Sequence, residues 1–337
     1  MRMRRAADWL DDSRLLAGLA LGARAVELHE QPAATPIAGR QALASARAVG
    51  LFAGSFNPLT RAHVALAEAA RMAGQLDVIA WTLAVETVNK ERVERATLPD
   101  RLAQLGAYCD GRAGDAIVVA NRGLYVDQAR ALHALMAPDA RLAIVVGYDK
   151  VVQIFDPRYY ANRDVALAAL FAEAELLVAP RAGQGPRDLE ALLARPESTR
   201  FAEAVHPMPL APEYAAESSS QVRTLAAVST ATAPRKLVTP EGWALARLGA
   251  YATQDDSSRV AAAYAVREAW EQALPGLEPA VVRALPPLSA LVAQVRAPEG
   301  AALRDWLDAR HTRQEELSAL LSQPPHDVGG RATRHER

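Results

Sequence analysis

The chain has 337 residues and a formal net charge of −1; half of its residues are hydrophobic and only 5% are aromatic. A charge this close to zero excludes the basic field that gathers around a nucleic acid polymer, whereas a small phosphorylated ligand remains a possible partner. The single cysteine, Cys109, excludes an internal disulfide framework and a cysteine-built zinc site, and it fits a reducing compartment, so a cytoplasmic location is expected.

Residues 1–45 are predicted to form a helical extension that ends in a linker. Arginines precede the apolar residues 15–25, as in a secretory signal segment, but Asp11, Asp12 and Arg14 interrupt the apolar run and favour an amphipathic helix. Two prolines and a glycine within residues 31–39 predict the linker. Because no run of about 18 apolar residues occurs, neither a transmembrane helix nor a membrane partner is predicted.

Short apolar runs alternate with helical segments over residues 46–235. Strands are predicted at 48–54, 76–83, 116–120, 141–147 and 175–180, and helices at 64–74, 98–109, 126–136 and 164–174. The strands lack polar alternation, which is typical of strands that crossover helices bury on both faces. The pattern therefore predicts an α/β domain with a doubly wound, Rossmann-like parallel sheet. Its prolines make residues 204–212 an edge strand.

The remaining C-terminal part is predicted to be helical over residues 236–322. These helices could cover the sheet, form a contact between subunits of a homo-oligomer or bind a partner. Residues 323–337 mix proline, glycine and charged residues, which predicts a disordered tail.

The segment GSFNPLTRAH, residues 54–63, connects the first strand of the domain to its helix. In a parallel sheet, ligands bind beyond the carboxyl ends of the strands, where this segment lies. Gly54 would allow a phosphate to approach the backbone, and the start of the helix supplies N–H groups. Thr60 could cap the helix or contact a phosphate, and His63 lies on the same helical face. Alternatively, Thr60 is only a cap and His63 is a surface or packed histidine.

This segment resembles the T/H-x-x-H phosphate-binding signature of the nucleotidyltransferase superfamily. It is most similar to nicotinamide or nicotinate mononucleotide adenylyltransferases, whose signature begins G-S-F-N-P. Over residues 46–230, further segments resemble this family in the same order. They are ETVNKERV (86–93), with Glu86 and Lys90 departing from S-x-V-N-D; LPDRLAQLGAY (98–108); GLYVDQARAL (123–132); VVGYDKVVQIFDPRYY (145–160), with Tyr148 and Tyr160 departing; and ESSSQVRTLA (217–226), similar to I-S-S/A-T-x-(I/V)-R.

The resemblance implies an enzyme of NAD biosynthesis that joins AMP from ATP to nicotinamide or nicotinate mononucleotide and releases pyrophosphate. Mg²⁺ would be carried by the ATP phosphates, without a metal site in the protein. The implied catalytic residues are His63, Arg223 and Thr60. The implied ATP-binding residues are Gly54, Ser55, Phe56, His63, Gly147, Asp149, Ser218, Ser219, Ser220 and Arg223. The implied mononucleotide-binding residues are Asn57, Val88, Asn89, Tyr125 and Tyr160.

In this interpretation, one cleft brings His63 and Arg223 to the same chain of phosphates. His63 donates to the transferring phosphate, Thr60 and Ser220 orient oxygens, and Arg223 holds the β- and γ-phosphates. Lys150 and Arg181, near predicted strand ends, are weaker candidates for phosphate binding.

Three alternatives remain at this stage. The serines at 218–220 could be a helix cap beside an ordinary surface arginine. A related nucleotidyltransferase would transfer AMP or CMP to another acceptor, such as phosphopantetheine or a polyol phosphate. A catalytically silent nucleotide-binding regulator would keep the fold without turnover, although the presence of both His63 and Arg223 argues against it.

Overall fold

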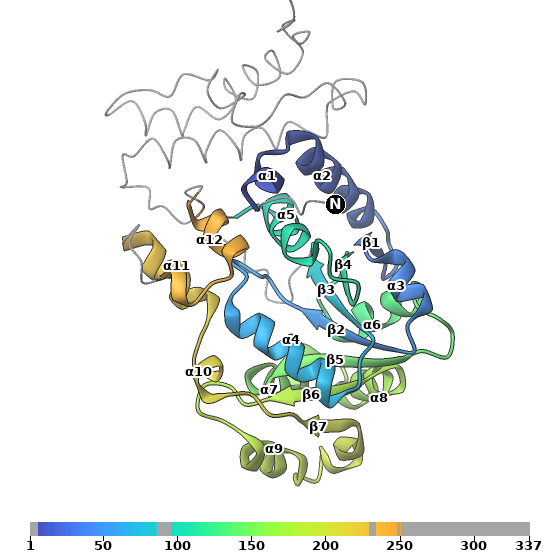
Figure 1. Cartoon of the computed structure of the whole chain (residues 1–337). Helices are drawn as coiled ribbons and strands as arrows, with labels where there is room; N and C mark the ends of the chain where they lie inside the picture. The colour runs from blue at the N-terminus through green and yellow to red at the C-terminus, as the bar shows by residue number, and fades with distance from the viewer. Residues whose placement is uncertain (1–5, 86–95, 229–233, 248–249, 251–337) are drawn as a thin grey trace, which may run out of the picture.

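The computed structural model describes residues 6–85, 96–228, 234–247 and 250. Within these residues, a seven-stranded sheet forms the centre of the molecule (Figure 1). Its order is β1 (Ala34–Ala38), β4 (Asp115–Ala120), β3 (Val78–Ala84), β2 (Ala48–Ala53), β5 (Arg141–Gly147), β6 (Glu175–Ala179) and β7 (Val205–Pro207). Neighbouring strands are parallel apart from the antiparallel pair of β1 and β4. The predicted doubly wound α/β sheet and its short edge strand β7 are confirmed.

Side chains alternate between the two faces of the sheet along each strand, and these strands are apolar on both faces. Helices therefore cover both faces. On β2, Phe52 belongs to one hydrophobic cluster and Leu51 to the other. The first cluster lies under α1 (Ala6–Asp11), α2 (Ser13–Glu27), α4 (Arg61–Ala73), α5 (Leu98–Cys109) and α12 (Pro240–Arg247). The second lies under α3 (Arg40–Ser45), α6 (Tyr125–His133), α7 (Tyr148–Phe155), α8 (Arg163–Glu173) and α9 (Pro186–Leu193). Two further helices, α10 (Pro212–Ala215) and α11 (Ser219–Val228), follow β7.

Strand β1 replaces part of the linker that the sequence predicts at residues 31–39. Pro36 rules out a helix there but is tolerated in an edge strand, where a missing N–H donor interrupts no inner ladder. The buried amide of Asn121 holds the approach to β1: it accepts from the Ala33 N–H and donates to the carbonyls of His29 and Gln31. Most of the C-terminal helical region and the predicted tail lie outside the described residues, and the domain limits stay a prediction.

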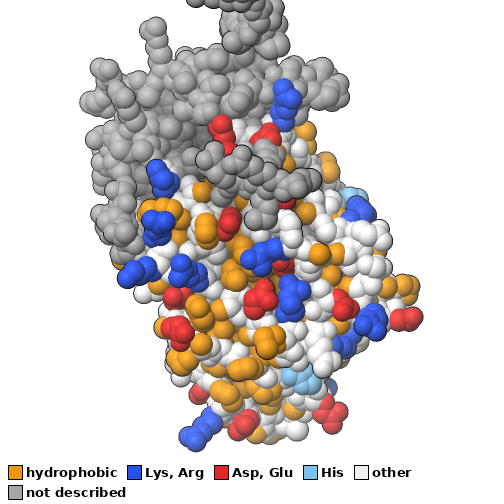
Figure 2. Space-filling model, in the orientation of Figure 1, with side chains coloured by type: hydrophobic (Ala, Val, Ile, Leu, Met, Phe, Trp, Pro, Cys, Tyr) orange, Lys and Arg blue, Asp and Glu red, His pale blue; other side chains and the backbone are white. Residues whose placement is uncertain are grey.

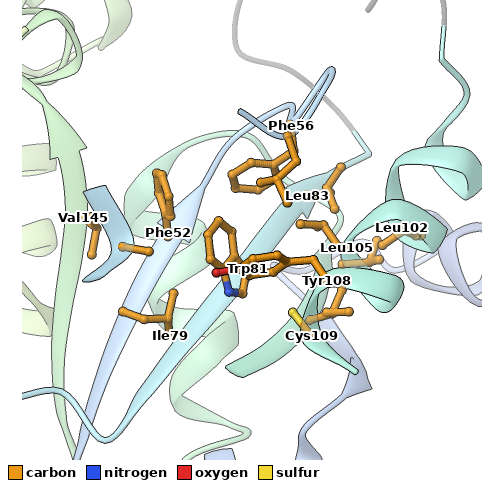
Figure 3. Packing of buried hydrophobic residues seen from close by; sticks show 14 of the residues in the cluster. Phe52, Phe56, Ile79, Trp81, Leu83, Leu102, Leu105, Tyr108, Cys109 and Val145 are labelled. Carbon is orange, nitrogen blue, oxygen red and sulfur yellow. The ribbon is translucent and has the colours of Figure 1, made fainter. Parts of the chain in front are cut away.

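An aromatic cluster ties the loop after β2 to the core. Figure 3 shows the Trp81 ring at its centre, with Phe52, Phe56 and Tyr108 around it. Ring centroids lie 5.2 Å from Trp81 to Phe52, 5.4 Å to Phe56 and 5.3 Å to Tyr108. Trp81 Nε1–H donates to Asp115 Oδ1 over 3.0 Å, and Arg71 Nη2 donates to the same oxygen over 2.9 Å. The buried carboxylate is thereby paired with a cation and a neutral donor.

We expect Trp81→Phe to lower the free energy of unfolding by about 1–3 kcal/mol, because it deletes the Nε1–H donor and shrinks the buried ring. Asp115 keeps its ion pair with Arg71, which limits the loss. Urea denaturation followed by circular dichroism measures the effect. A variant with the same denaturation midpoint and slope as the wild type would contradict this account of the cluster.

On the face shown in Figure 2, Lys and Arg side chains are interspersed with Asp and Glu side chains. Among the described residues, exposed ion pairs include Arg24 with Glu27 and Arg200 with Asp164. None of the described helices has the length and apolar character needed to cross a membrane.

Candidate active site

The loop of residues 54–59 leaves the carboxyl end of β2 and leads into α4. Its first N–H, at Gly54, donates to the carbonyl of Thr82 in β3 over 3.1 Å. Phe56 is fully buried and adopts a left-handed conformation, with φ of 44°. A Cβ at Gly54 would lie 3.0 Å from the Phe56 ring, so glycine gives this ring its space. The loop is thus folded back onto the core by an aromatic anchor.

Thr60 and His63 form a reciprocal cap at the start of α4. The His63 N–H donates to Thr60 Oγ1 over 3.3 Å, and the Thr60 N–H donates to His63 Nδ1 over 3.0 Å. A backbone N–H can only donate, so Nδ1 must be the acceptor and Nε2 carries the proton of the neutral ring. The predicted cap therefore exists, and it also sets the tautomer and direction of the imidazole.

The imidazole of His63 is held neutral by its surroundings. Burial lowers its pKa from 6.5 to about 3, and the positive charge of Arg181 contributes in the same direction. The ring packs against Phe56 at a centroid distance of 5.2 Å and against Phe52 at 6.1 Å. At neutral pH, His63 is a hydrogen-bond donor through Nε2 and does not contribute a cation.

This depressed pKa makes stability depend on pH in a defined direction. The unfolded chain protonates His63 below pH 6.5, whereas the folded chain does not until about pH 3, so the unfolded state gains protons and stability falls as pH decreases through this window. In NMR, the His63 ring signal should stay unchanged between about pH 8 and pH 5.

His63→Asn identifies that signal by its loss and should flatten the decline of the unfolding free energy with falling pH. Titration of the wild-type His63 signal near its ordinary value of 6.5 would contradict the assignment.

Helix α11 brings its serines and Arg223 against the loop. Ser218 Oγ accepts from the Gln221 N–H over 3.2 Å, so it caps the helix. Ser219 Oγ donates to the carbonyl of Pro58 over 3.1 Å. Arg223 donates from Nη1 to the carbonyl of Asn57 over 2.7 Å and from Nη2 to Ser220 Oγ over 2.9 Å. The helix cap proposed for these serines from the sequence is therefore present. Arg223 also links α11 to the 54–59 loop, through a hydrogen bond to a residue 166 positions away.

The segment before α12 supports the other side of the loop. The Arg61 N–H donates to the carbonyl of Leu237 over 2.9 Å, and the Thr239 N–H donates to the carbonyl of Leu59 over 3.3 Å. Thr60 and Val238 form an antiparallel bridge between these bonds. Figure 1 shows α11 and α12 beside the start of α4. Gly242 is required by this approach, because a Cβ there would lie 2.4 Å from the carbonyl oxygen of Leu59.

A second turn lies at the carboxyl ends of β5 and β6. Gly147 ends β5 and precedes α7, and a Cβ there would lie 2.7 Å from Asp149 Oδ1 and 3.4 Å from the Arg181 side chain. Glycine thus lets Asp149 and Arg181 pack over the turn. The positive charge of Arg181 also contributes to the low pKa of His63, so this side chain lies within electrostatic range of the imidazole. Arg181, a weaker candidate in the sequence, is therefore close to His63.

The predicted mononucleotide residues are partly gathered beside this turn. Burial raises the pKa of Tyr125, with smaller contributions from the nearby Asp149 carboxylate and the Tyr160 hydroxyl. Asp149 and Tyr160 therefore both lie within electrostatic range of Tyr125, although the three residues come from different segments. Val88 and Asn89 lie outside the described residues. Tyr148 packs away from this group, with its hydroxyl donating to the Asp188 carbonyl over 3.1 Å.

A family model described as cytidylyltransferase-like matches residues 51–225, more than half of the chain. The chain belongs to this family of nucleotidyltransferases. The resemblance predicted from the sequence is confirmed at this level, and the protein is an enzyme of this kind.

Two curated relatives of this nucleotidyltransferase carry the name probable nicotinate-nucleotide adenylyltransferase. The protein of Gloeobacter violaceus is 31% identical over 149 residues, which cover 43% of this chain and 68% of the relative. The protein of Desulfatibacillum aliphaticivorans is 27% identical over 141 residues, covering 41% of this chain and 62% of the relative. The matches thus span about two thirds of the length of these relatives.

Solved structures give a weaker likeness. The Plasmodium falciparum nicotinic acid mononucleotide adenylyltransferase complexed with NaAD shares 13% identity with this nucleotidyltransferase at a TM-score of 0.45, covering 59% of this chain and 94% of that one. Its complex with APC shares 12% identity at a TM-score of 0.44, covering 61% of this chain and 97% of that one. At TM-scores this low, neither structure bears on the function of this chain.

Two buried side chains of the nucleotidyltransferase were not predicted to contribute to the site. Arg101 and Gln104 of α5 bond to backbone groups of the 54–59 loop. In the sequence, these two residues could have been noticed as polar residues three positions apart on a predicted helix that is otherwise mostly apolar on its buried side. Glu217, which replaces the isoleucine of the family pattern, lies near Arg61 and Arg181, and burial raises its pKa.

Proposed function

We propose that this nucleotidyltransferase transfers AMP from ATP to nicotinate or nicotinamide mononucleotide, forming the dinucleotide and pyrophosphate. The observation that carries the proposal is the hydrogen bond from the Thr60 N–H to His63 Nδ1 after a GSFNP loop, because it leaves the proton of the neutral ring on Nε2. The names of the two curated relatives support nicotinate mononucleotide as the first acceptor to test.

The chemistry suits a site without a protein nucleophile. The 5′-phosphate of the mononucleotide is already an anion; one of its oxygens attacks the α-phosphorus of ATP while the bond to the bridging β-phosphate oxygen breaks. Pyrophosphate leaves with the electron pair of that bond. The enzyme must align two polyanions and offset their charge. Nε2–H of His63 would donate to the transferring phosphate, and its low pKa favours this role over proton transfer.

Cations of the chain would stabilise the triphosphate side. Arg181 lies close enough to His63 to lower its pKa, and Arg223 is fixed to the loop at Asn57. Thr60 and Ser220 are the hydroxyl residues proposed to orient phosphate oxygens. Ser220 Oγ accepts a hydrogen bond from Arg223, so the hydroxyl and the guanidinium are close enough to bind the same phosphate group.

Mg²⁺ is proposed to enter on the ATP phosphates. The described side chains around His63 offer mainly imidazole, guanidinium and hydroxyl groups, and no group of three or more His, Cys, Asp or Glu among the described residues could hold a metal ion. This donor set fits a metal whose oxygen ligands come from phosphates and water. Bound in that way, Mg²⁺ would neutralise charge on the departing pyrophosphate.

Aromatic residues are proposed to hold the acceptor. Tyr160 would stack on the electron-poor pyridine ring, and Tyr125 lies beside it. Asn57, Val88 and Asn89 are the further proposed contacts to the mononucleotide.

The deciding experiment mixes purified protein with ATP, Mg²⁺ and each mononucleotide separately, and measures dinucleotide and pyrophosphate. Nicotinate adenine dinucleotide formed in step with pyrophosphate would support the proposal, and the ratio of kcat/KM for the two acceptors gives the ring preference. Product only with another phosphorylated acceptor would favour the related transferase. ATP binding without any product would favour the regulator.

A further inference from the structure

The buried side-chain amide of Gln104 on α5 forms hydrogen bonds with the backbone of the 54–59 loop. Gln104 is 0% exposed. Its Oε1 accepts from the Leu59 N–H over 2.8 Å, and its Nε2 donates to the Phe56 carbonyl over 2.8 Å. One side chain therefore satisfies a buried donor and a buried acceptor on either side of Asn57 and Pro58. One turn earlier on α5, Arg101 donates from Nη1 to the Ser55 carbonyl over 3.0 Å.

The loop needs this support because its backbone is not in a relaxed conformation. Phe56 has φ of 44°, a left-handed conformation that is unfavourable for residues other than glycine. Phe56 and Leu59 are also fully buried, so their polar backbone groups have no access to water. Without the amide, the loop would relax toward conformations that hydrate these groups.

The groups that matter for chemistry are attached directly to this loop. Leu59 is followed by Thr60, whose N–H sets the tautomer of His63. The carbonyl of Asn57, between Phe56 and Pro58, accepts a hydrogen bond from Arg223. A shift of the loop would move the imidazole and the guanidinium together. Misplacement of reacting groups by about 1 Å can cost roughly 100-fold in rate.

We propose that Gln104 is a positioning residue of the transfer reaction, whose amide fixes residues 56–59 by donating and accepting at the same time. The proposal rests on the proposed function for its kinetic test. It requires a side chain with both a donor and an acceptor. Methionine fills a similar volume without a donor and with only a weak sulfur acceptor. An ionised glutamate only accepts, whereas a neutral glutamic acid does both in nearly the same shape.

Gln104→Glu turns this requirement into a pH profile. Burial favours the neutral acid, whereas the Arg101 guanidinium one turn earlier favours the carboxylate, so the pKa of the new carboxyl depends on both. The neutral acid, formed at low pH, restores both hydrogen bonds, and ionisation at higher pH places a carboxylate against the Phe56 carbonyl. We expect kcat of Gln104→Glu to approach the wild-type value at low pH and to fall about 10–100-fold below it as pH rises. Gln104→Met should lose a similar factor at every pH. The KM for ATP should change less than kcat in both variants.

Asn121→Asp is the matched control. Asn121 is 2% exposed and also bonds three backbone groups, but it holds residues 29–33 instead of the motif loop. Its replacement introduces the same amide-to-carboxyl change in a buried clamp. Per folded molecule, we expect its kcat to follow the wild-type pH profile. A profile shared by Gln104→Glu and Asn121→Asp would overturn the proposal.

Amide hydrogen exchange tests the placement of the loop without turnover. Mass spectrometry of peptides covering residues 55–60 should show faster exchange in Gln104→Met than in the wild type, with no such change in Asn121→Asp. If the wild type makes no dinucleotide, the proposed function fails, and the exchange rates still decide whether Gln104 holds the loop. Unchanged exchange in folded Gln104→Met would overturn the proposal. If Gln104→Met does not fold, amide exchange of the same peptides in Gln104→Glu is compared between about pH 5.5 and higher pH, and faster loop exchange at the higher pH, after correction for the intrinsic exchange rate, is the expected result.

Discussion

A His63→Ala variant is expected to slow dinucleotide formation by about 100–1000-fold. Loss of one preorganised donor to a developing anionic centre costs about 2.7–4 kcal/mol of transition-state stabilisation, and the neutral imidazole offers such a donor through Nε2. The measurement is kcat at saturating ATP and mononucleotide. Because His63 acts on the transferring phosphate in this proposal, kcat should fall more than the affinity for ATP.

His63→Asn separates the two roles of this residue. The asparagine Oδ1 can take the place of Nδ1 and accept from the Thr60 N–H, which preserves the helix cap, but no donor then reaches the position of Nε2. We expect this variant to be as slow as His63→Ala, while its unfolding free energy exceeds that of His63→Ala by about 1 kcal/mol. Wild-type turnover in either folded variant would end the assignment of His63.

The second large effect is expected from Arg223→Ala, which should lower kcat/KM for ATP by about 10–100-fold. The change removes a charge-assisted hydrogen bond to the Asn57 carbonyl and a cation proposed to hold the β- and γ-phosphates. Arg223→Lys should recover only part of the loss, because one ammonium group cannot reproduce the forked donation to Asn57 and Ser220. Steady-state kinetics at varied ATP concentration measures both.

Arg187→Ala is the control for charge alone. Arg187 is exposed on α9, and we expect its removal to leave kcat/KM for ATP unchanged. If Arg223→Ala and Arg187→Ala give the same kinetics, Arg223 has no special role with nucleotide. If Arg223→Ala lowers the unfolding free energy without changing kinetics, its bond to Asn57 is structural only.

The sheet could be predicted from the sequence because its strands are continuous apolar runs and its helices have clear periodicity. β2, β3, β4, β5 and β6 all coincide with predicted strands. β1 was missed because its pairing with β4 depends on a strand more than 70 residues away, while Pro36 and Gly39 locally suggest a linker. Tertiary pairing therefore outweighed local signals in that segment.

The candidate site was predictable as a set of segments but not as a set of contacts. The GSFNPLTRAH string locates His63 and Thr60, yet nothing local indicates that Gln104 bonds both sides of Asn57 and Pro58. Similarly, Tyr148 differs from the family pattern beside Gly147, but its hydroxyl bonds the Asp188 carbonyl. These contacts depend on how helices pack over the sheet, and one-dimensional spacing does not contain that information. The roles assigned to the site residues stay predictions.

The pairing of residues 59–61 with residues 237–239 has a consequence for biosynthesis. The Thr239 and Leu59 backbones that meet beside the loop are 180 positions apart. At a translation rate of about 5–20 residues per second, roughly 10–40 seconds separate their emergence from the ribosome. A nascent chain can thus assemble its central strands first, while residues 59–61 gain their backbone bonds to residues 237–239 only later in synthesis.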